Sequence, residues 1–208
     1  MRPVLALRVS WPVTDSYRHA VDVESVFAQG GLMTKHPDGP SVQIEVIPAA
    51  PEQEAVLGNL LELYMHDFSE LRDFDLGPDG RFGYRLLPLY WSDPDRHPFL
   101  IRIDGKLAGF ALVKRGSEVC GNGAVWDMAE FFVIRGYRRR GFGTQVAQEL
   151  WRRFPGRWEI RVMQLNVTAH RFWARAISRF TGEAVAPVAF EKGGENWKLF
   201  SFESKRVS

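Results

Sequence analysis

The chain has 208 residues, of which 45% are hydrophobic and 25% charged, as is ordinary for a globular protein of one domain. Its net charge of +2 argues against a general attraction to nucleic acids or membranes, and its single cysteine, Cys120, excludes a disulfide framework. The apolar run at residues 4–7 is too short for a signal peptide, so we expect a cytoplasmic protein.

The charge is unevenly distributed along the chain. Residues 135–161 contain eight arginines and two glutamates, a local charge of 8 − 2 = +6 that leaves −4 for the rest. A basic zone in an otherwise acidic protein suggests a small polyanionic ligand, although a solvated helix face is the commoner explanation of an arginine cluster.

Residues 1–40 are predicted to be an N-terminal extension of unknown role, and residues 41–208 the main domain. Thr14 or Asp15 could cap a helix that runs to the Gly30–Gly31 break, and the Pro- and Gly-rich residues 34–41 indicate a loop. Contacts in a homodimer are one role open to this extension.

The main domain begins with a strand at residues 42–47, and Pro51 then opens a helix that extends to residue 68. Helical spacing places Val56, Leu60, Leu63 and Tyr64 on one face of this helix. After a Gly- and Pro-rich region, two strands at 99–103 and 106–113 are joined by Asp104–Gly105, a pair that favours a tight hairpin turn.

The strand that ends near residue 134 is apolar on both faces, which is typical of a central strand. A helix over 144–154, a strand over 158–165, a helix over 168–180 closed by Gly182 and a final hairpin over 185–202 follow. The apolar residues of strand 158–165 change faces, as a bulge or a splayed edge would require. This order predicts a mixed α/β fold, with helices on both faces of one sheet.

The stretch from Tyr137 to Thr144, YRRRGFGT, joins the central strand to the next helix. The first N–H groups of a helix have no intrahelical partner, and glycines at 141 and 143 leave them accessible, so a phosphate group is the natural ligand. The sequence does not fit a P-loop, because Phe142 and Gly143 stand where Lys and Ser/Thr belong. A dinucleotide fingerprint would need a small residue at Val146.

These residues resemble the acetyl-CoA-binding signature of the GNAT superfamily of N-acyltransferases, Arg/Gln-x-x-Gly-x-Gly/Ala, which here reads from Arg138 to Gly143. The segment LNVTAHRFWARAISRFTG is similar to the family's Asn-x-x-Ala-x-x-Phe-Tyr/Trp segment, and LYMHDFSEL to a poorly characterised bacterial branch of predicted acetyltransferases. The likeness covers residues 42–203. It implies a mostly antiparallel sheet whose fourth and fifth strands splay apart, with acetyl-CoA as acyl donor.

The resemblance implies a role for each matching residue. Main-chain groups of Phe132, Val133 and Ile134 would pair with the pantetheine arm, and the N–H of Val133 would bind the thioester oxygen. Asn166 would lie near the same arm or cap the following helix. The remaining residues expected to contact acetyl-CoA are Arg138, Arg139, Arg140, Gly141, Phe142, Gly143, Thr144, Phe172 and Trp173.

Acyl transfer to an amine also needs a group that removes a proton from the amine. Glu130 is the leading candidate because it matches a carboxylate that the family often carries on its fourth strand, although a Glu paired with an arginine is nearly as good an interpretation. Asp127 and the pair His66 and Asp67 are weaker candidates for this base, and His66, Asp67 and Trp91 are candidates for the acceptor pocket. Five scattered histidines without a ligand motif give no metal site.

One position departs from the family pattern. Trp173 stands where the family commonly places the tyrosine that protonates the departing thiolate. The prediction is therefore an N-acetyltransferase that uses acetyl-CoA and acts on a primary amine of a small molecule or protein. Two alternatives stay open: an acyl-CoA-binding or regulatory protein with little turnover, and a nucleic-acid-binding module that uses the arginine cluster.

Overall fold

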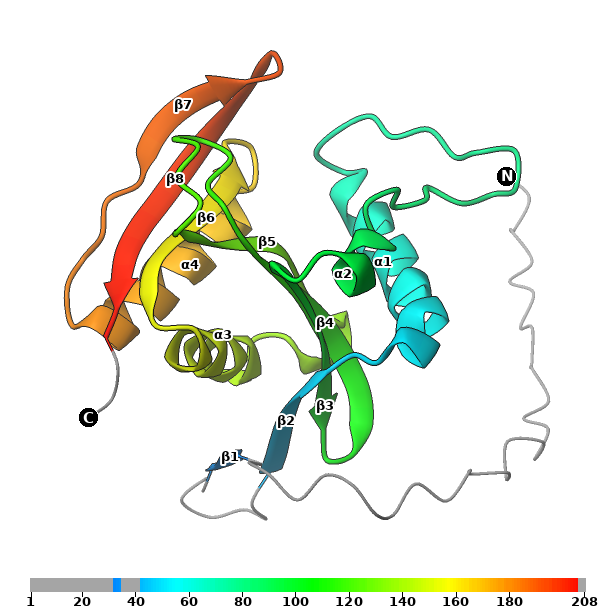
Figure 1. Ribbon diagram of the computed structural model, residues 1–208, viewed down its shortest axis with the longest axis horizontal. Helices are drawn as coiled ribbons and strands as arrows, with labels where there is room; N and C mark the ends of the chain where they lie inside the picture. The colour runs from blue at the N-terminus through cyan, green and yellow to red at the C-terminus, as the bar shows by residue number, and fades with distance from the viewer. Residues whose placement is uncertain (1–31, 35–41, 206–208) are drawn as a thin grey trace, which may run out of the picture. The chain divides into compact units, whose positions relative to one another are not determined.

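The structure of the protein, a computed structural model, describes residues 32–34 and 42–205. The helices and strands of these residues belong to one compact unit (Figure 1). The helix predicted between Thr14 and Gly30 lies outside the described residues. Within the described ranges, no helix is both long and apolar enough to cross a membrane.

One sheet of eight strands, in the order β1-β2-β3-β4-β5-β6-β8-β7, forms the centre of the unit. The strands are β1 (Leu32–Thr34), β2 (Val42–Pro48), β3 (Arg96–Ile103), β4 (Lys106–Arg115), β5 (Trp126–Val133), β6 (Gly156–Met163), β7 (Val188–Lys192) and β8 (Glu195–Ser204). Neighbouring strands are antiparallel except for β5 and β6, which confirms the predicted mixed sheet. Because β1 pairs with β2, the sheet begins before the predicted boundary at residue 41.

Helices cover both faces of this sheet. They are α1 (Glu54–Phe68), which follows a 3₁₀ turn at Pro51–Gln53, and α2 (Leu89–Ser92), α3 (Phe142–Arg153) and α4 (Val167–Thr181). Figure 1 shows α1 and α2 on one face, and α3 and α4 on the other. Each face has its own hydrophobic core, and the strands β3, β4 and β5 contribute buried residues to both.

Two local predictions from glycine are confirmed. Asp104 and Gly105 both have positive φ angles, 50° and 72°, as a tight turn between β3 and β4 requires. Gly182 ends α4 in the left-handed conformation at φ 79°.

The predicted inner face of α1 is rotated relative to the observed one. Leu57, Leu60 and Leu61 are the buried residues, whereas Leu63 is 52% exposed and Val56 is also exposed. Both sets have helical spacing, since α1 is apolar over a broad arc. Packing against the sheet decides between them.

Strand β6 contains no bulge against β8. Its register is regular from Gly156 opposite Ser204 to Met163 opposite Trp197. Its apolar pattern changes faces because it is buried on both, with Glu159 only 2% exposed and hydrogen-bonded to Ser117. The predicted splay is present, between β5 and β6, which pair at only two positions.

Gly109 of β4 allows the close approach of β5, because a Cβ atom there would lie 2.1 Å from the carbonyl oxygen of Phe132. We expect Gly109→Ala to lower the free energy of unfolding by about 3 kcal/mol, since the backbone itself would have to move. Urea denaturation measures this cost. Gly123→Ala is the matched control, since nothing lies within 4 Å of its added methyl group; equal stability of the two variants would contradict the prediction.

Candidate active site

The central strands β5 and β6 separate soon after they meet. Their parallel pairing consists of two residue pairs, Trp126 with Trp158 and Asp127 with Glu159. Beyond these pairs β5 continues along β4 to Val133, and β6 continues along β8 to Met163. The edge of β5 that faces β6 is therefore open after Asp127, as the predicted splay requires.

Within this open part, Val133 directs its main-chain groups away from β4. The N–H of Ile134 donates to the carbonyl of Ala108 at 2.8 Å, which makes the pair Ala108–Ile134 a hydrogen-bonded one. Because such pairs alternate along an antiparallel ladder, the N–H and C=O of Val133 point toward β6. Phe132 directs both groups to β4, and the C=O of Ile134 accepts the N–H of Tyr137 at 2.9 Å. The C=O of Val133 accepts a hydrogen bond from Arg138, so of these three residues only Val133 has an N–H free for a ligand in the gap.

A bulge in β5 sets the direction of Glu130. Leu112 lies opposite Glu130, but Val113 lies opposite Met128, so Ala129 is the extra residue. Met128 faces the core under α3 and α4, and strict alternation would return Glu130 to that core. The extra residue instead brings Glu130 to the opposite face, beneath α1, where its partners are polar.

The two oxygens of Glu130 are held by two tyrosines. Tyr64 of α1 donates its hydroxyl to Oε2 at 2.6 Å, and Tyr84 donates to Oε1 at 3.0 Å. Burial raises the pKa of Glu130 above its ordinary value, although the two hydroxyls and the charge of Arg161 act in the other direction. A carboxyl group with a raised pKa, held by two hydroxyl groups, is suited to accept and return a proton.

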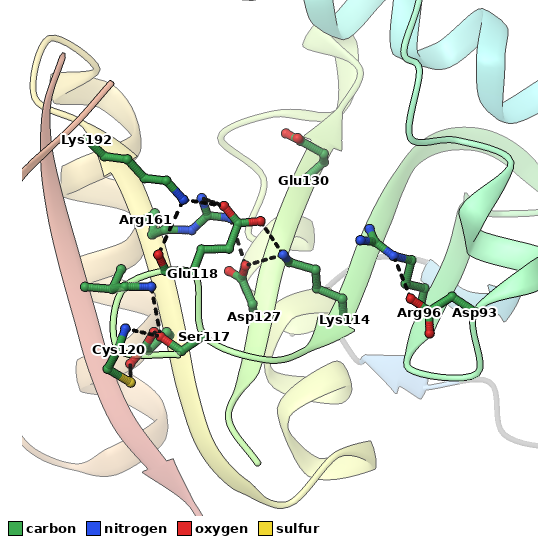
Figure 2. A network of polar contacts seen from close by, with 12 residues as sticks. Asp93, Arg96, Lys114, Ser117, Glu118, Cys120, Asp127, Glu130, Arg161 and Lys192 are labelled. Carbon is green, nitrogen blue, oxygen red and sulfur yellow. Dashed lines mark hydrogen bonds and ion pairs between the residues drawn. The ribbon is translucent and has the colours of Figure 1, made fainter. Parts of the chain in front are cut away.

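Asp127, the other carboxylate on this face of β5, belongs to an ion-pair network (Figure 2). It is 1% exposed and lies 2.8 Å from Arg161 of β6 and 3.7 Å from Lys114 of β4. Glu118 joins the network through Lys114, Arg161 and Lys192. These contacts tie β4, β5 and β6 together at the last residue pair before the strands separate, so the position of Asp127 is that of a structural residue.

The loop before α3 has the backbone that an anion site needs. Arg139 has φ 62°, and Gly141 precedes the helix at φ 84°, a conformation that favours glycine. No side chain among the described residues caps this helix, so the N–H groups of Phe142, Gly143 and Thr144 begin it without intrahelical partners. The side chain of Phe142 is buried in the core and anchors the start of the helix.

The two glycines of the signature differ in what they contribute. Gly141 supplies the left-handed turn. A Cβ atom on Gly143 would lie 3.3 Å from the ring of Phe172, so this glycine also allows α3 to pack closely on α4. Sequence reasoning assigned both glycines to ligand access, and the packing role of Gly143 is additional.

The arginines of the loop have different partners. Arg138 donates to the carbonyl of Val133 at 2.6 Å and to Asp67 at 2.5 Å, and Arg135 donates to the other oxygen of Asp67 at 2.7 Å. Partial burial acts to raise the pKa of Asp67, but these hydrogen bonds outweigh it and hold the pKa below the ordinary value. Arg138 thus anchors the loop to α1. The guanidinium of Arg140 lies over the ring of Phe142 at 5.0 Å, beside the start of α3.

The three residues predicted for the acceptor pocket are not brought together with Glu130. Asp67 is paired with the two arginines, His66 is exposed, and Trp91 donates its indole N–H to the carbonyl of Ala49 at 2.9 Å. The structure instead places Tyr64 and Tyr84 beside Glu130. Tyr64 and Tyr84 are separated from Glu130 by 66 and 46 positions in the sequence. No spacing pattern links residues so far apart, so neither contact could be predicted from the sequence.

The first turns of α4 pack against β5. Asn166 accepts a hydrogen bond from the N–H of Ala169 at 3.0 Å and so caps the helix, as one of its two interpretations predicted. Phe172 stacks on Phe131 of β5, with 5.8 Å between ring centroids. Trp173 is 6% exposed and packs against Phe131, a position in the core.

A surface groove lies where α1, β6 and the β7–β8 turn converge. Its volume of about 500 Å³ is sufficient for a small molecule or a short peptide segment. An ion pair of 2.9 Å between Arg72 and Glu195 joins two of its walls, and Glu70 and Asp73 add negative charge. Within the described residues, no group of three His, Cys, Asp or Glu side chains is arranged to hold a metal ion.

The profile of the Acetyltransferase (GNAT) family matches residues 58–177, and no curated protein matches the chain. The fold is similar to that of an acetyltransferase from Thermus thermophilus, with 17% identity, a TM-score of 0.56 and coverage of 77% of this chain and 96% of that one. It is also similar to YncA of Salmonella typhimurium with its cofactor acetyl-CoA, at 12% identity, TM-score 0.53 and coverage of 79% and 96%.

A third similar structure is the aminoglycoside acetyltransferase AAC(6')-Ib in complex with coenzyme A, at 13% identity, TM-score 0.59 and coverage of 77% and 94%. At these identities the structures establish the fold, and the profile establishes the family. Because the profile covers more than half of the sequence, including the splayed strands and the loop before α3, the chain belongs to the GNAT family of acetyltransferases.

Proposed function

We propose that the protein is an N-acetyltransferase that transfers the acetyl group of acetyl-CoA to a primary amine. The observation that carries this proposal is the open edge of β5, where the N–H of Val133 faces the gap left by β6 beside the uncapped start of α3. One site thus presents a donor for a thioester oxygen and a cluster of amides for a diphosphate. The acetyl-CoA and coenzyme A in two similar structures support this choice of donor.

The diphosphate of acetyl-CoA would bind the amides of Phe142, Gly143 and Thr144. The helix dipole and the positive charges of Arg139 and Arg140 favour an anion at this place. The pantetheine arm would then extend along β5 and fill part of the open edge. Arg138 takes an indirect part, since it holds the loop against Asp67 and Val133.

In the transfer step, the amine nitrogen forms a bond to the carbonyl carbon of the thioester while the oxygen becomes negatively charged. The N–H of Val133 would stabilise this oxygen, and one such donor is worth about 3 kcal/mol. Glu130 would take the proton from the attacking amine. The carbon–sulfur bond then breaks and releases CoA as a thiolate. Because the pKa of the corresponding thiol is about 8.5, the thiolate can leave without a proton from a tyrosine, the residue that Trp173 replaces.

The conformation of Gly141 provides the first test. We expect Gly141→Ala to raise the KM for acetyl-CoA by about tenfold, because a side chain strains the left-handed turn that orients the amides of α3. Gly182→Ala is the matched control: it imposes the same strain at φ 79° at the end of α4, away from the loop. Steady-state kinetics and thermal melts of both variants make the comparison, and an equal rise in KM in the control would contradict the assignment.

The role of Glu130 provides the second test. In an assay of CoA-thiol release over a panel of amines, Glu130→Gln should lower kcat by about 10²- to 10⁴-fold with little change in the affinity for acetyl-CoA. The amide keeps the shape of the side chain and cannot accept the proton. Thermal stabilisation of the native protein by acetyl-CoA without turnover of any amine would instead favour an acyl-CoA-binding protein.

A further inference from the structure

Both oxygens of the Glu130 carboxylate are held by hydrogen bonds. Each of its oxygens accepts a hydrogen bond from a different tyrosine, Tyr64 at 2.6 Å and Tyr84 at 3.0 Å. The two hydroxyls come from separate segments, since Tyr64 lies in α1 and Tyr84 in the loop between α1 and α2. Together they fix the position and the rotation of the carboxylate plane.

Both tyrosines are themselves held in place. The ring of Tyr64 packs edge-on against Phe110 and Phe132 in the core beneath α1. The loop that carries Tyr84 is attached to α1 by Glu62, whose carboxylate accepts the N–H of Phe82 at 2.8 Å and the N–H of Gly83 at 3.0 Å. The hydroxyls are therefore presented to Glu130 by a rigid frame.

Several ionisable groups surround Glu130. They are Tyr64 of α1, Tyr84 of the following loop, Tyr90 of α2, Asp127 of β5 and Arg161 of β6. The pKa of each tyrosine is raised, first by burial and then by the negative charge of Glu130, so all three remain hydroxyl groups at neutral pH. Tyr64 and Tyr84 can then only donate to a carboxylate, which stabilises its charged form.

We propose that Tyr64 and Tyr84 are positioning residues for Glu130, which fix its two oxygens and set the pH range over which it accepts a proton from the amine. This inference rests on the proposed function, in which Glu130 is the base. It assigns the two hydroxyls no direct contact with the reacting atoms. Their effect on the reaction passes through the carboxylate.

The direction of the effect follows from the hydrogen bonds. Removal of one hydroxyl destabilises the charged form of Glu130, so the pKa of this carboxyl group rises further. Because the base must be deprotonated to act, the acidic limb of the kcat/KM profile moves to higher pH. On that limb we expect a loss of roughly tenfold for each hydroxyl, with recovery of most activity on the alkaline plateau.

The experiment compares Tyr64→Phe and Tyr84→Phe with Tyr90→Phe. Tyr90 is a matched control, because it belongs to the same cluster but its hydroxyl makes no hydrogen bond to Glu130. The pH profile of kcat/KM is measured with the most active amine of the panel. In parallel, ¹³C NMR follows the titration of the Glu130 carboxyl carbon in each variant, a readout that needs neither an acceptor nor turnover.

We expect the carboxyl titration and the acidic limb to move to higher pH in Tyr64→Phe and Tyr84→Phe and to stay in place in Tyr90→Phe. A pH-independent loss of activity with an unchanged carboxyl titration would overturn the inference. The variant Glu130→Gln separates this inference from the proposed function. If it keeps full activity, Glu130 is not the base and the inference falls with that role. If it is inactive while the pH profiles of Tyr64→Phe and Tyr84→Phe do not shift, only the inference is refuted.

Discussion

The site depends on one constraint of the sheet, namely that β5 pairs with β4 along its length but with β6 at only two positions. A regular ladder would consume the main-chain groups of Val133 in a strand–strand hydrogen bond. The separation leaves the N–H of Val133 to a ligand, while its carbonyl accepts a hydrogen bond from Arg138 of the loop before α3. The buried network of Asp127, Arg161 and Lys114 fixes the point at which the strands part.

The bulge at Ala129 places Glu130 and Phe131 on opposite faces of β5, in different surroundings. On one face, Phe131 packs with Phe172 and Trp173 in the aromatic core under α3 and α4. On the other face, Glu130 meets the tyrosines beneath α1. One extra residue thus brings a carboxylate beneath α1 on the strand that also offers the Val133 N–H, without a charge in the aromatic core.

Several local elements could be predicted from the sequence because their signals are short-range. The Asp104–Gly105 turn, the left-handed Gly182 and the junction between β5 and α3 each depend on a few adjacent residues. The contacts between α1 and the segment from β5 to α3 could not be predicted in the same way. They join Glu130 to Tyr64 and Arg138 to Asp67, pairs 66 and 71 residues apart, and only the packed sheet brings them together.

The central claim is that the open edge of β5 and the start of α3 form one acyl-donor site. Amide chemical shifts of ¹⁵N-labelled protein, titrated with acetyl-CoA and separately with CoA, test it most directly. Both ligands should shift the amides of Phe142, Gly143 and Thr144, and acetyl-CoA alone should strongly shift the amide of Val133, because only it carries the thioester oxygen. Saturable binding that leaves these four amides unmoved and shifts others would contradict the account.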